Sequence, residues 1–198
     1  MQEEYFNFYG KIVIIKSEWD ELSLLLRKDF SFFKCSKILN NSKSLVVTIF
    51  NKSSKEIQIP KSPSMMQSLN SITYQINQKR YNDYYGKLTS VVDYENNQAQ
   101  LYSLDLDKTQ EVAYLLILSR VGKALDLEGL HKLHAFAVSY KKIAFVCMMP
   151  MKGGKSTLLM ELLKNKEVKL ISDDIPMINS NGELVPFPIK IGLEMDRE

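Results

Sequence analysis

Residues 143–165 read IAFVCMMPMKGGKSTLLMELLKN, and this stretch contains three successive structural signals. The apolar run over 143–149 favours a buried strand, the glycines at 153 and 154 indicate a loop, and the amphipathic residues from Lys155 favour a helix. A buried strand that passes through a glycine-containing loop into a helix is the setting of a phosphate-binding loop. The stretch therefore predicts an α/β fold around an anion-binding turn.

The residue types in this loop suit a bound nucleotide. Gly153 and Gly154 lack side chains, so backbone N–H groups can surround phosphate oxygens, and the positive end of the helix dipole points at the same anion. Lys155 would place its ammonium group on the β and γ phosphates, and the Ser156 hydroxyl would be a ligand of Mg²⁺. We therefore expect ATP and Mg²⁺ as cofactors, with these cofactor-binding residues: Gly153, Gly154, Lys155, Ser156 and Thr157.

The start of the loop departs from the full phosphate-binding pattern. That pattern has a glycine five positions before Gly154, where this chain has Met149 followed by Pro150. The chain is therefore expected to bend differently at this point. A helix that begins at Lys155 and binds no ligand is the alternative interpretation, because short glycine-lysine-serine matches also occur by chance.

Two carboxylates follow the next apolar stretch. Residues 168–172, VKLIS, favour a strand that ends at Asp173 and Asp174, and an α/β sheet binds its ligand at the carboxyl ends of its strands. One carboxylate could hold Mg²⁺ and the other could accept a proton, while adjacent side chains on an extended backbone point to opposite sides. The pair is therefore a candidate for catalysis and metal binding, with a solvated acidic turn as the alternative.

His134 is a further candidate, because it stands at the start of the predicted strand 134–140, fifteen residues before Met149. A lone histidine is more often a hydrogen-bonded structural residue than a catalyst. The residue pattern alone therefore leaves its role open, and His131 is the weaker candidate of the two histidines.

The first hundred residues favour strands with one helix. Ser17 and the acidic residues after it begin a helix that extends to about residue 30. Strands are expected at 9–16, 45–50, 56–59, 72–76, 88–94 and 99–104. Their spacing suits an antiparallel meander, and a helix is expected over 107–129. We therefore expect a β-rich, antiparallel amino-terminal domain over 1–107 and an α/β domain over 108–198.

Composition limits the class of protein. The chain has 198 residues, 45% hydrophobic and 25% charged, with net charge +3, which fits one globular domain or two small ones. Scattered lysines supply the excess charge, so nucleic-acid binding is not expected. No apolar run approaches the roughly 18–20 residues that span a bilayer, and the start MQEEYFNF lacks the order of a signal peptide. A cytoplasmic protein without membrane partners is expected.

The succession LHAFAV, PMKGGKSTLLMELL, LISDD and VPFPIKI resembles the HPr kinase/phosphorylase superfamily, especially its relatives encoded beside peptide-modification genes. The resemblance covers roughly residues 108–192. It implies that Asp173 is the base toward the substrate hydroxyl, with Asp174 close by. It also implies that His134 lies near the aspartate and sets its proton-accepting state. With this family's chemistry, Ser156 and Asp174 are the expected ligands of Mg²⁺.

The resemblance also sets the expected function. The domain over 108–198 is about half as long as this family's fold, so it is expected to be incomplete at its carboxyl end, and a homo-oligomer or a partner chain could complete it. The expected activity is that of an ATP-dependent kinase, which transfers the γ-phosphoryl group to a hydroxyl, with serine of a peptide or protein as the acceptor. A non-catalytic nucleotide- or phosphate-binding recognition subunit in a peptide-maturation system is the alternative.

Overall fold

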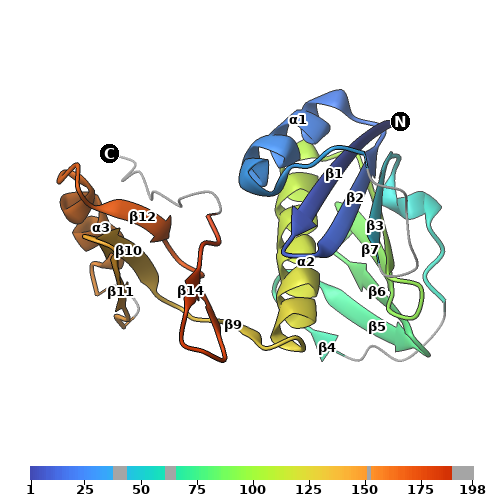
Figure 1. Ribbon diagram of the computed structural model, residues 1–198. Helices are drawn as coiled ribbons and strands as arrows, with labels where there is room; N and C mark the ends of the chain where they lie inside the picture. Colours follow the sequence, from blue (N-terminus) through green and yellow to red (C-terminus); the bar gives the residue numbers. More distant parts are fainter. Residues whose placement is uncertain (38–43, 61–65, 151–152, 189–198) are drawn as a thin grey trace. The chain divides into compact units, whose positions relative to one another are not determined.

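The computed structural model describes residues 1–37, 44–60, 66–150 and 153–188 of the chain (Figure 1). The protein is mixed α/β, with a large, mostly antiparallel sheet and, across these ranges, three α-helices. The chain divides into two compact units, Met1–Val121 and Gly122–Glu198. The division falls inside helix α2 (Leu106–Asp126), whereas the sequence indicated a boundary near residue 107. Among the described helices, none is both long and apolar enough to cross a bilayer.

The first unit is built on an eight-stranded sheet with the order β1-β2-β3-β8-β7-β6-β5-β4. The strands are β1 (Gln2–Phe8), β2 (Lys11–Ser17), β3 (Leu45–Asn51), β4 (Met66–Gln67), β5 (Ile72–Ile76), β6 (Lys79–Asp83), β7 (Leu88–Asp93) and β8 (Gln98–Ser103). The strands predicted at 45–50, 72–76, 88–94 and 99–104 are confirmed as β3, β5, β7 and β8. The prediction of a β-rich first half, mostly antiparallel, is therefore confirmed.

The meander predicted for this unit is wrong around β3. This strand pairs in parallel with both of its neighbours, with Val13 of β2 opposite Leu45 and Gln98 of β8 opposite Val46. The chain passes from β2 to β3 through helix α1 (Asp20–Asp29), and a helical crossover returns the next strand in the same direction. The other described pairs of this sheet are antiparallel.

Residues 56–59 do not form the predicted strand. A short 3-10 helix covers Ser54–Glu56, and the hydroxyl of Ser53 before it accepts a hydrogen bond from the Lys55 amide at 3.3 Å. The Ser54 hydroxyl donates to the Gly86 carbonyl at 2.6 Å. Local hydrogen bonds from serine side chains compete with strand pairing, and the apolar alternation of this short run does not reveal them.

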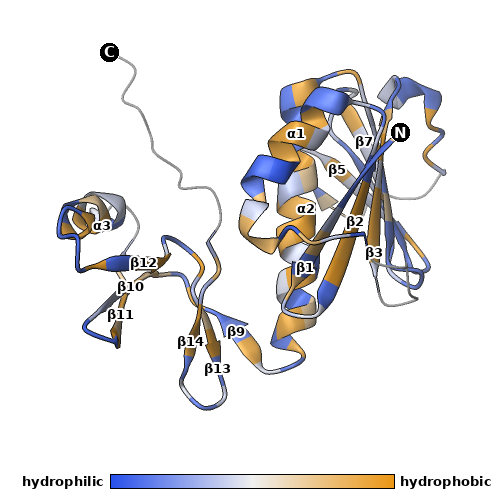
Figure 2. Ribbon diagram, turned by 45° about the horizontal axis from the view of Figure 1, so that its top comes forward, coloured by the Kyte–Doolittle hydropathy of each residue, from blue (hydrophilic) through white to orange (hydrophobic). Residues whose placement is uncertain are grey.

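Helices α1 and α2 lie on the same face of this sheet, as Figures 1 and 2 show. Phe6, Phe8 and Phe30 are fully buried there, and their ring centroids are 5.5–6.4 Å apart. Phe30 also stacks on Tyr114 of α2, with the centroids 5.3 Å apart. Aromatic contacts of this kind add to the free energy gained by burial, so the phenylalanine cluster holds both helices on the sheet.

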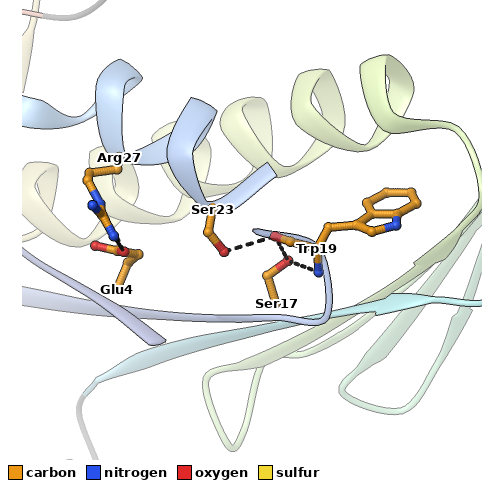
Figure 3. A network of polar contacts seen from close by, with 5 residues as sticks. All are labelled: Glu4, Ser17, Trp19, Ser23 and Arg27. Atoms are coloured by element: carbon orange, nitrogen blue, oxygen red, sulfur yellow. Dashed lines mark hydrogen bonds and ion pairs between the residues drawn. The ribbon is translucent and has the colours of Figure 1, made fainter. Parts of the chain in front are cut away.

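A polar network anchors α1 at the edge of this core (Figure 3). The buried Ser17 hydroxyl accepts a hydrogen bond from the Trp19 amide at 3.0 Å, and the Ser23 hydroxyl donates to the Trp19 carbonyl at 3.1 Å. One face of α1 also carries Arg27, which pairs with the buried carboxylate of Glu4 in β1. The two serine contacts satisfy polar groups at the start of α1, where some backbone groups lack partners within the helix, and the Arg27 pair joins its last turn to β1.

The second unit contains two three-stranded sheets and helix α3 (Lys155–Leu163). One sheet has the order β11-β10-β12 and the other has the order β14-β13-β9. The strands are β9 (Leu130–Lys132), β10 (Phe136–Tyr140), β11 (Ile143–Cys147), β12 (Lys169–Ser172), β13 (Met177–Asn179) and β14 (Leu184–Val185). Leu159 of α3 packs on Phe136 and Val138 of β10, and this small cluster fixes the helix against its sheet.

Candidate active site

The strand directions in the β11-β10-β12 sheet bring three chain segments to the same end of the strands. β10 is antiparallel to both neighbours, so β11 and β12 run in the same direction with β10 between them. At the start of β10, Phe136 is opposite Cys147 and Ala137 is opposite Ser172, the last residues of β11 and β12. The segment before β10 and the loops after β11 and β12 therefore lie at this same end of the strands. These are the segments in which the sequence placed its candidate site residues.

Two glycines allow the loop after β11 to turn into α3. Gly154 precedes the helix with φ of 84°, in the left-handed region that favours glycine. At Gly153, an added Cβ would lie 2.9 Å from the Pro150 carbonyl oxygen, which accepts a hydrogen bond from the Gly153 amide at 2.9 Å. Residues 151 and 152 of the predicted loop lie outside the described residues. The turn leads directly into the first amides of α3, which have no partners within the helix.

On the prediction that this loop binds a nucleotide, Gly153→Ala should weaken that binding, because the new Cβ would force a backbone carbonyl to move. We expect the ATP affinity to fall about tenfold, which corresponds to roughly 1.4 kcal/mol of loop strain. Gly122→Ala in α2 is the matched control, since its Cβ would meet only the flexible end of Lys132 at 3.8 Å. Isothermal titration with ATP measures both variants, and equal affinities for them would contradict this function of Gly153.

Lys155 and His134 converge on one carboxylate. The Lys155 ammonium group donates a hydrogen bond to Oδ1 of Asp174, and Nδ1 of His134 lies 3.3 Å from the same oxygen. The side chain of Lys155 is 17% exposed, that of Asp174 is 44% exposed and that of His134 is 73% exposed. The Ala135 amide donates to the Asp174 carbonyl at 3.2 Å, which ties the two backbone segments together. The structure thus brings three predicted site residues together where solvent reaches them.

Asp173 lies in a drier environment than Asp174. Its Oδ1 atom is buried and, within the described part of the chain, has no hydrogen-bond partner. Burial raises the pKa of the Asp173 carboxyl above its ordinary value, and the charge of Asp174 raises this pKa further, while Lys155 acts in the opposite direction. The Asp173 carboxyl therefore holds a proton more readily than an ordinary aspartate does.

The raised pKa of Asp173 predicts a pH dependence of stability. Below the ordinary pKa of 3.8, the Asp173 carboxyl is protonated in both the folded and the unfolded chain. The folded chain favours the protonated carboxyl over the ionised one, so the stabilisation of the fold by this group is fully present there. This stabilisation is lost as the pH rises through the higher pKa of the folded chain. Asp173→Asn removes the titration, so the free energy of unfolding of the parent should fall relative to that of the variant across this range. Urea unfolding at a series of pH values measures this difference, and a constant difference would contradict the prediction.

The residues present fit a magnesium ion that arrives with a nucleotide. Ser156 and Thr157 lie in the first turn of α3 and are exposed. No group of three or more His, Cys, Asp or Glu side chains among the described residues is placed to hold a metal ion. Mg²⁺ commonly binds through one or two carboxylates together with water and substrate phosphates. Ser156 and Asp174 could supply such a partial set of ligands, and the adjacent Asp173 has a carboxylate oxygen without a partner among the described residues.

Sequence reasoning does not identify the contacts by which two residues position the site. Ser172 is buried, its hydroxyl donates to the Phe187 carbonyl at 3.1 Å, and it accepts from the Ile175 amide at 3.3 Å. These bonds hold the turn that contains Asp173. The second residue is Pro150, whose carbonyl closes the glycine loop. For Ser172, the only local signal was its position directly before the two aspartates, because the Phe187 contact joins separate segments.

No family model matches this chain, and the comparisons found no similar curated protein and no similar solved structure.

Proposed function

We propose that this protein is an ATP-dependent kinase of the HPr-kinase type, which transfers the γ-phosphoryl group to a hydroxyl, with serine of a peptide or protein as the acceptor. The observation that carries the proposal is the contact between Lys155 and Asp174, beside a glycine loop that leads into α3. A lysine at such a helix start, with carboxylates opposite, supplies the charges that nucleotide phosphates and Mg²⁺ need. The kinase type comes from the motif resemblance over residues 108–192.

Phosphate binding is assigned to the loop and to Lys155. The amides in the first turn of α3, together with its dipole, would bind phosphate oxygens. Lys155 has three N–H donors, so it can donate to a phosphate while it keeps its bond to Asp174. Ser156 and Asp174 would hold Mg²⁺, which neutralises charge on the phosphate oxygens when it is bound.

Proton transfer is assigned to Asp173. A general base works best when its pKa lies near the working pH, and burial raises the pKa of this carboxyl in that direction. His134 contacts Asp174 and would act through that carboxylate, not on the substrate hydroxyl directly. Positioning of the reactants and neutralisation of phosphate charge would supply most of the rate enhancement.

Thermal unfolding with Mg²⁺·ATP, followed by assays for ADP and phosphopeptide, tests this proposal. A kinase should be stabilised by the nucleotide and should release ADP in step with phosphopeptide formation. Stabilisation without any turnover would identify the alternative, a non-catalytic nucleotide-binding recognition subunit. If no nucleoside triphosphate stabilises the chain, nucleotide binding itself is contradicted.

A further inference from the structure

The first unit contains a cavity of about 320 Å³ that the proposed kinase site does not use. It lies between α2 and the strands β6 and β7, and all of its lining residues belong to the first unit. This volume is at the lower end of the range for small-molecule sites, roughly 300–1,000 Å³. The cavity is therefore large enough for a small ligand.

Two arginines contact the same aromatic ring in this cavity. The guanidinium carbon of Arg80 in β6 lies 5.4 Å from the centroid of the Tyr94 ring, and that of Arg120 in α2 lies 4.7 Å from it. Both distances are within the range for attraction between a cation and an aromatic face. Tyr94 thus keeps the two positive groups in one place, although their charges repel each other.

Neutral groups, not carboxylates, orient these two arginines. Nε of Arg80 donates to the Gln75 side-chain oxygen at 3.3 Å, and Nη2 of Arg120 donates to the Asn97 side-chain oxygen at 3.1 Å. Within the described residues, neither guanidinium group forms an ion pair. A guanidinium group has five N–H donors, so each arginine keeps donors for a ligand.

The charges that line the cavity do not balance. Its charged side chains are Arg80, Arg120, Lys108 and Glu111, which leaves three positive charges against one negative charge. Glu111 is already paired with Lys108, whose Nζ lies 2.8 Å from its carboxylate. The surplus of two positive charges therefore resides on the two arginines, and an anion would relieve their mutual repulsion.

The other residues that line the cavity indicate what kind of molecule would fit beside the two arginines. Val92, Val112 and Leu116 supply apolar surface. On the polar side, the Asn82 side-chain amide donates to the buried Ser90 hydroxyl at 2.9 Å. Apolar walls combined with a few placed polar groups are typical of sites for small organic ligands. A molecule with one anionic end and a short apolar body matches both parts of this lining.

We propose that this cavity binds a small organic anion, in which a carboxylate or a phosphate monoester accepts hydrogen bonds from Arg80 and Arg120 while a short apolar body contacts Val112 and Leu116. The site is independent of the proposed kinase chemistry, because none of its residues belongs to the second unit. Guanidinium groups pair well with carboxylate and phosphate oxygens, so both headgroups remain in the same ligand class.

Isothermal titration of the full chain with hexanoate, phenyl phosphate and inorganic phosphate tests the inference. We expect hexanoate or phenyl phosphate to bind more tightly than inorganic phosphate, and the stronger of the two identifies the preferred headgroup. Arg80→Gln and Arg120→Gln should each weaken that binding about tenfold or more. Lys123→Gln is the matched control, because it removes an exposed cation of α2 that does not line the cavity.

The controls separate this site from the proposed nucleotide site. Lys155→Ala should leave hexanoate and phenyl phosphate binding unchanged, and loss of binding in that variant would assign the probe to the nucleotide site and overturn the inference. It would also be overturned if the parent chain bound none of the probes at millimolar concentration. Equal weakening by Lys123→Gln and by the arginine variants would indicate nonspecific attraction and would overturn it as well.

Discussion

Lys155→Ala is expected to abolish measurable binding of ATP, with a loss of affinity of at least about a hundredfold. The lysine is the positive side chain at the start of α3, and in the proposed complex it donates charged hydrogen bonds to phosphate oxygens. Hydrogen bonds to charged groups contribute roughly 1.5–3 kcal/mol each, so the loss of two such bonds accounts for this effect. Isothermal titration with Mg²⁺·ATP measures it directly.

Lys164→Ala is the matched control for this experiment. Lys164 follows the last turn of α3 and pairs with Glu161 at 2.5 Å, so the variant also removes one lysine from an ion pair. The Lys164 pair is mostly exposed, and surface pairs of this kind contribute little to stability. The control should bind ATP like the parent chain. Parent-like affinity of Lys155→Ala would contradict the proposed site, whatever the activity of the chain.

Asp173→Asn is expected to retain ATP binding and to lose phosphoryl transfer. The amide has nearly the shape of the carboxylate but cannot accept the proton of an attacking hydroxyl. General-base catalysis contributes roughly 10²–10⁴ in rate, and we expect a loss of that size. Because burial disfavours the ionised carboxylate at this position, a neutral side chain of the same shape should leave the fold intact.

Single-turnover measurements with saturating Mg²⁺·ATP separate transfer from binding in this variant. Asp126→Asn is the control, since Asp126 is an exposed acid of the same unit that pairs with His131 at 2.5 Å. The control should transfer phosphate at the parent rate. Transfer at the parent rate by Asp173→Asn would remove this residue from the mechanism, even if nucleotide binding were intact.

The local parts of the fold could be predicted, while the pairing of distant segments could not. The strand at 72–76 combines β-branched and aromatic residues, ITYQI, with polar turns on both sides, so its pattern matched β5. By contrast, the parallel pairing of β3 with β8 joins segments with several other strands between them, and no local pattern encodes it. The 3-10 helix at Ser54–Glu56 depends on a hydroxyl contact with Gly86, which is equally invisible in a short window.

In the candidate site, too, the local motifs could be predicted, while the contacts between distant segments could not. The glycine loop, Lys155 and the two aspartates could be identified from spacing, because each lies at the end of a strand pattern. The structure places antiparallel β10 between β12 and the parallel strand β11. That inserted strand is what brings His134 to Asp174. Its order in the sheet depends on tertiary contacts, so the histidine was linked to the aspartates through resemblance alone.

The parallel position of β3 has a consequence for how the first unit folds. Strands β5 to β8 follow one another as hairpins and can pair while the intervening chain is short. β3 instead pairs with β2 across α1 on one side and with β8 across the whole hairpin series on the other. Closing such long loops costs chain entropy before any contact is gained. The docking of β3 should therefore be the slow step, and a nascent chain would remain unfinished in this region until β8 had been synthesised.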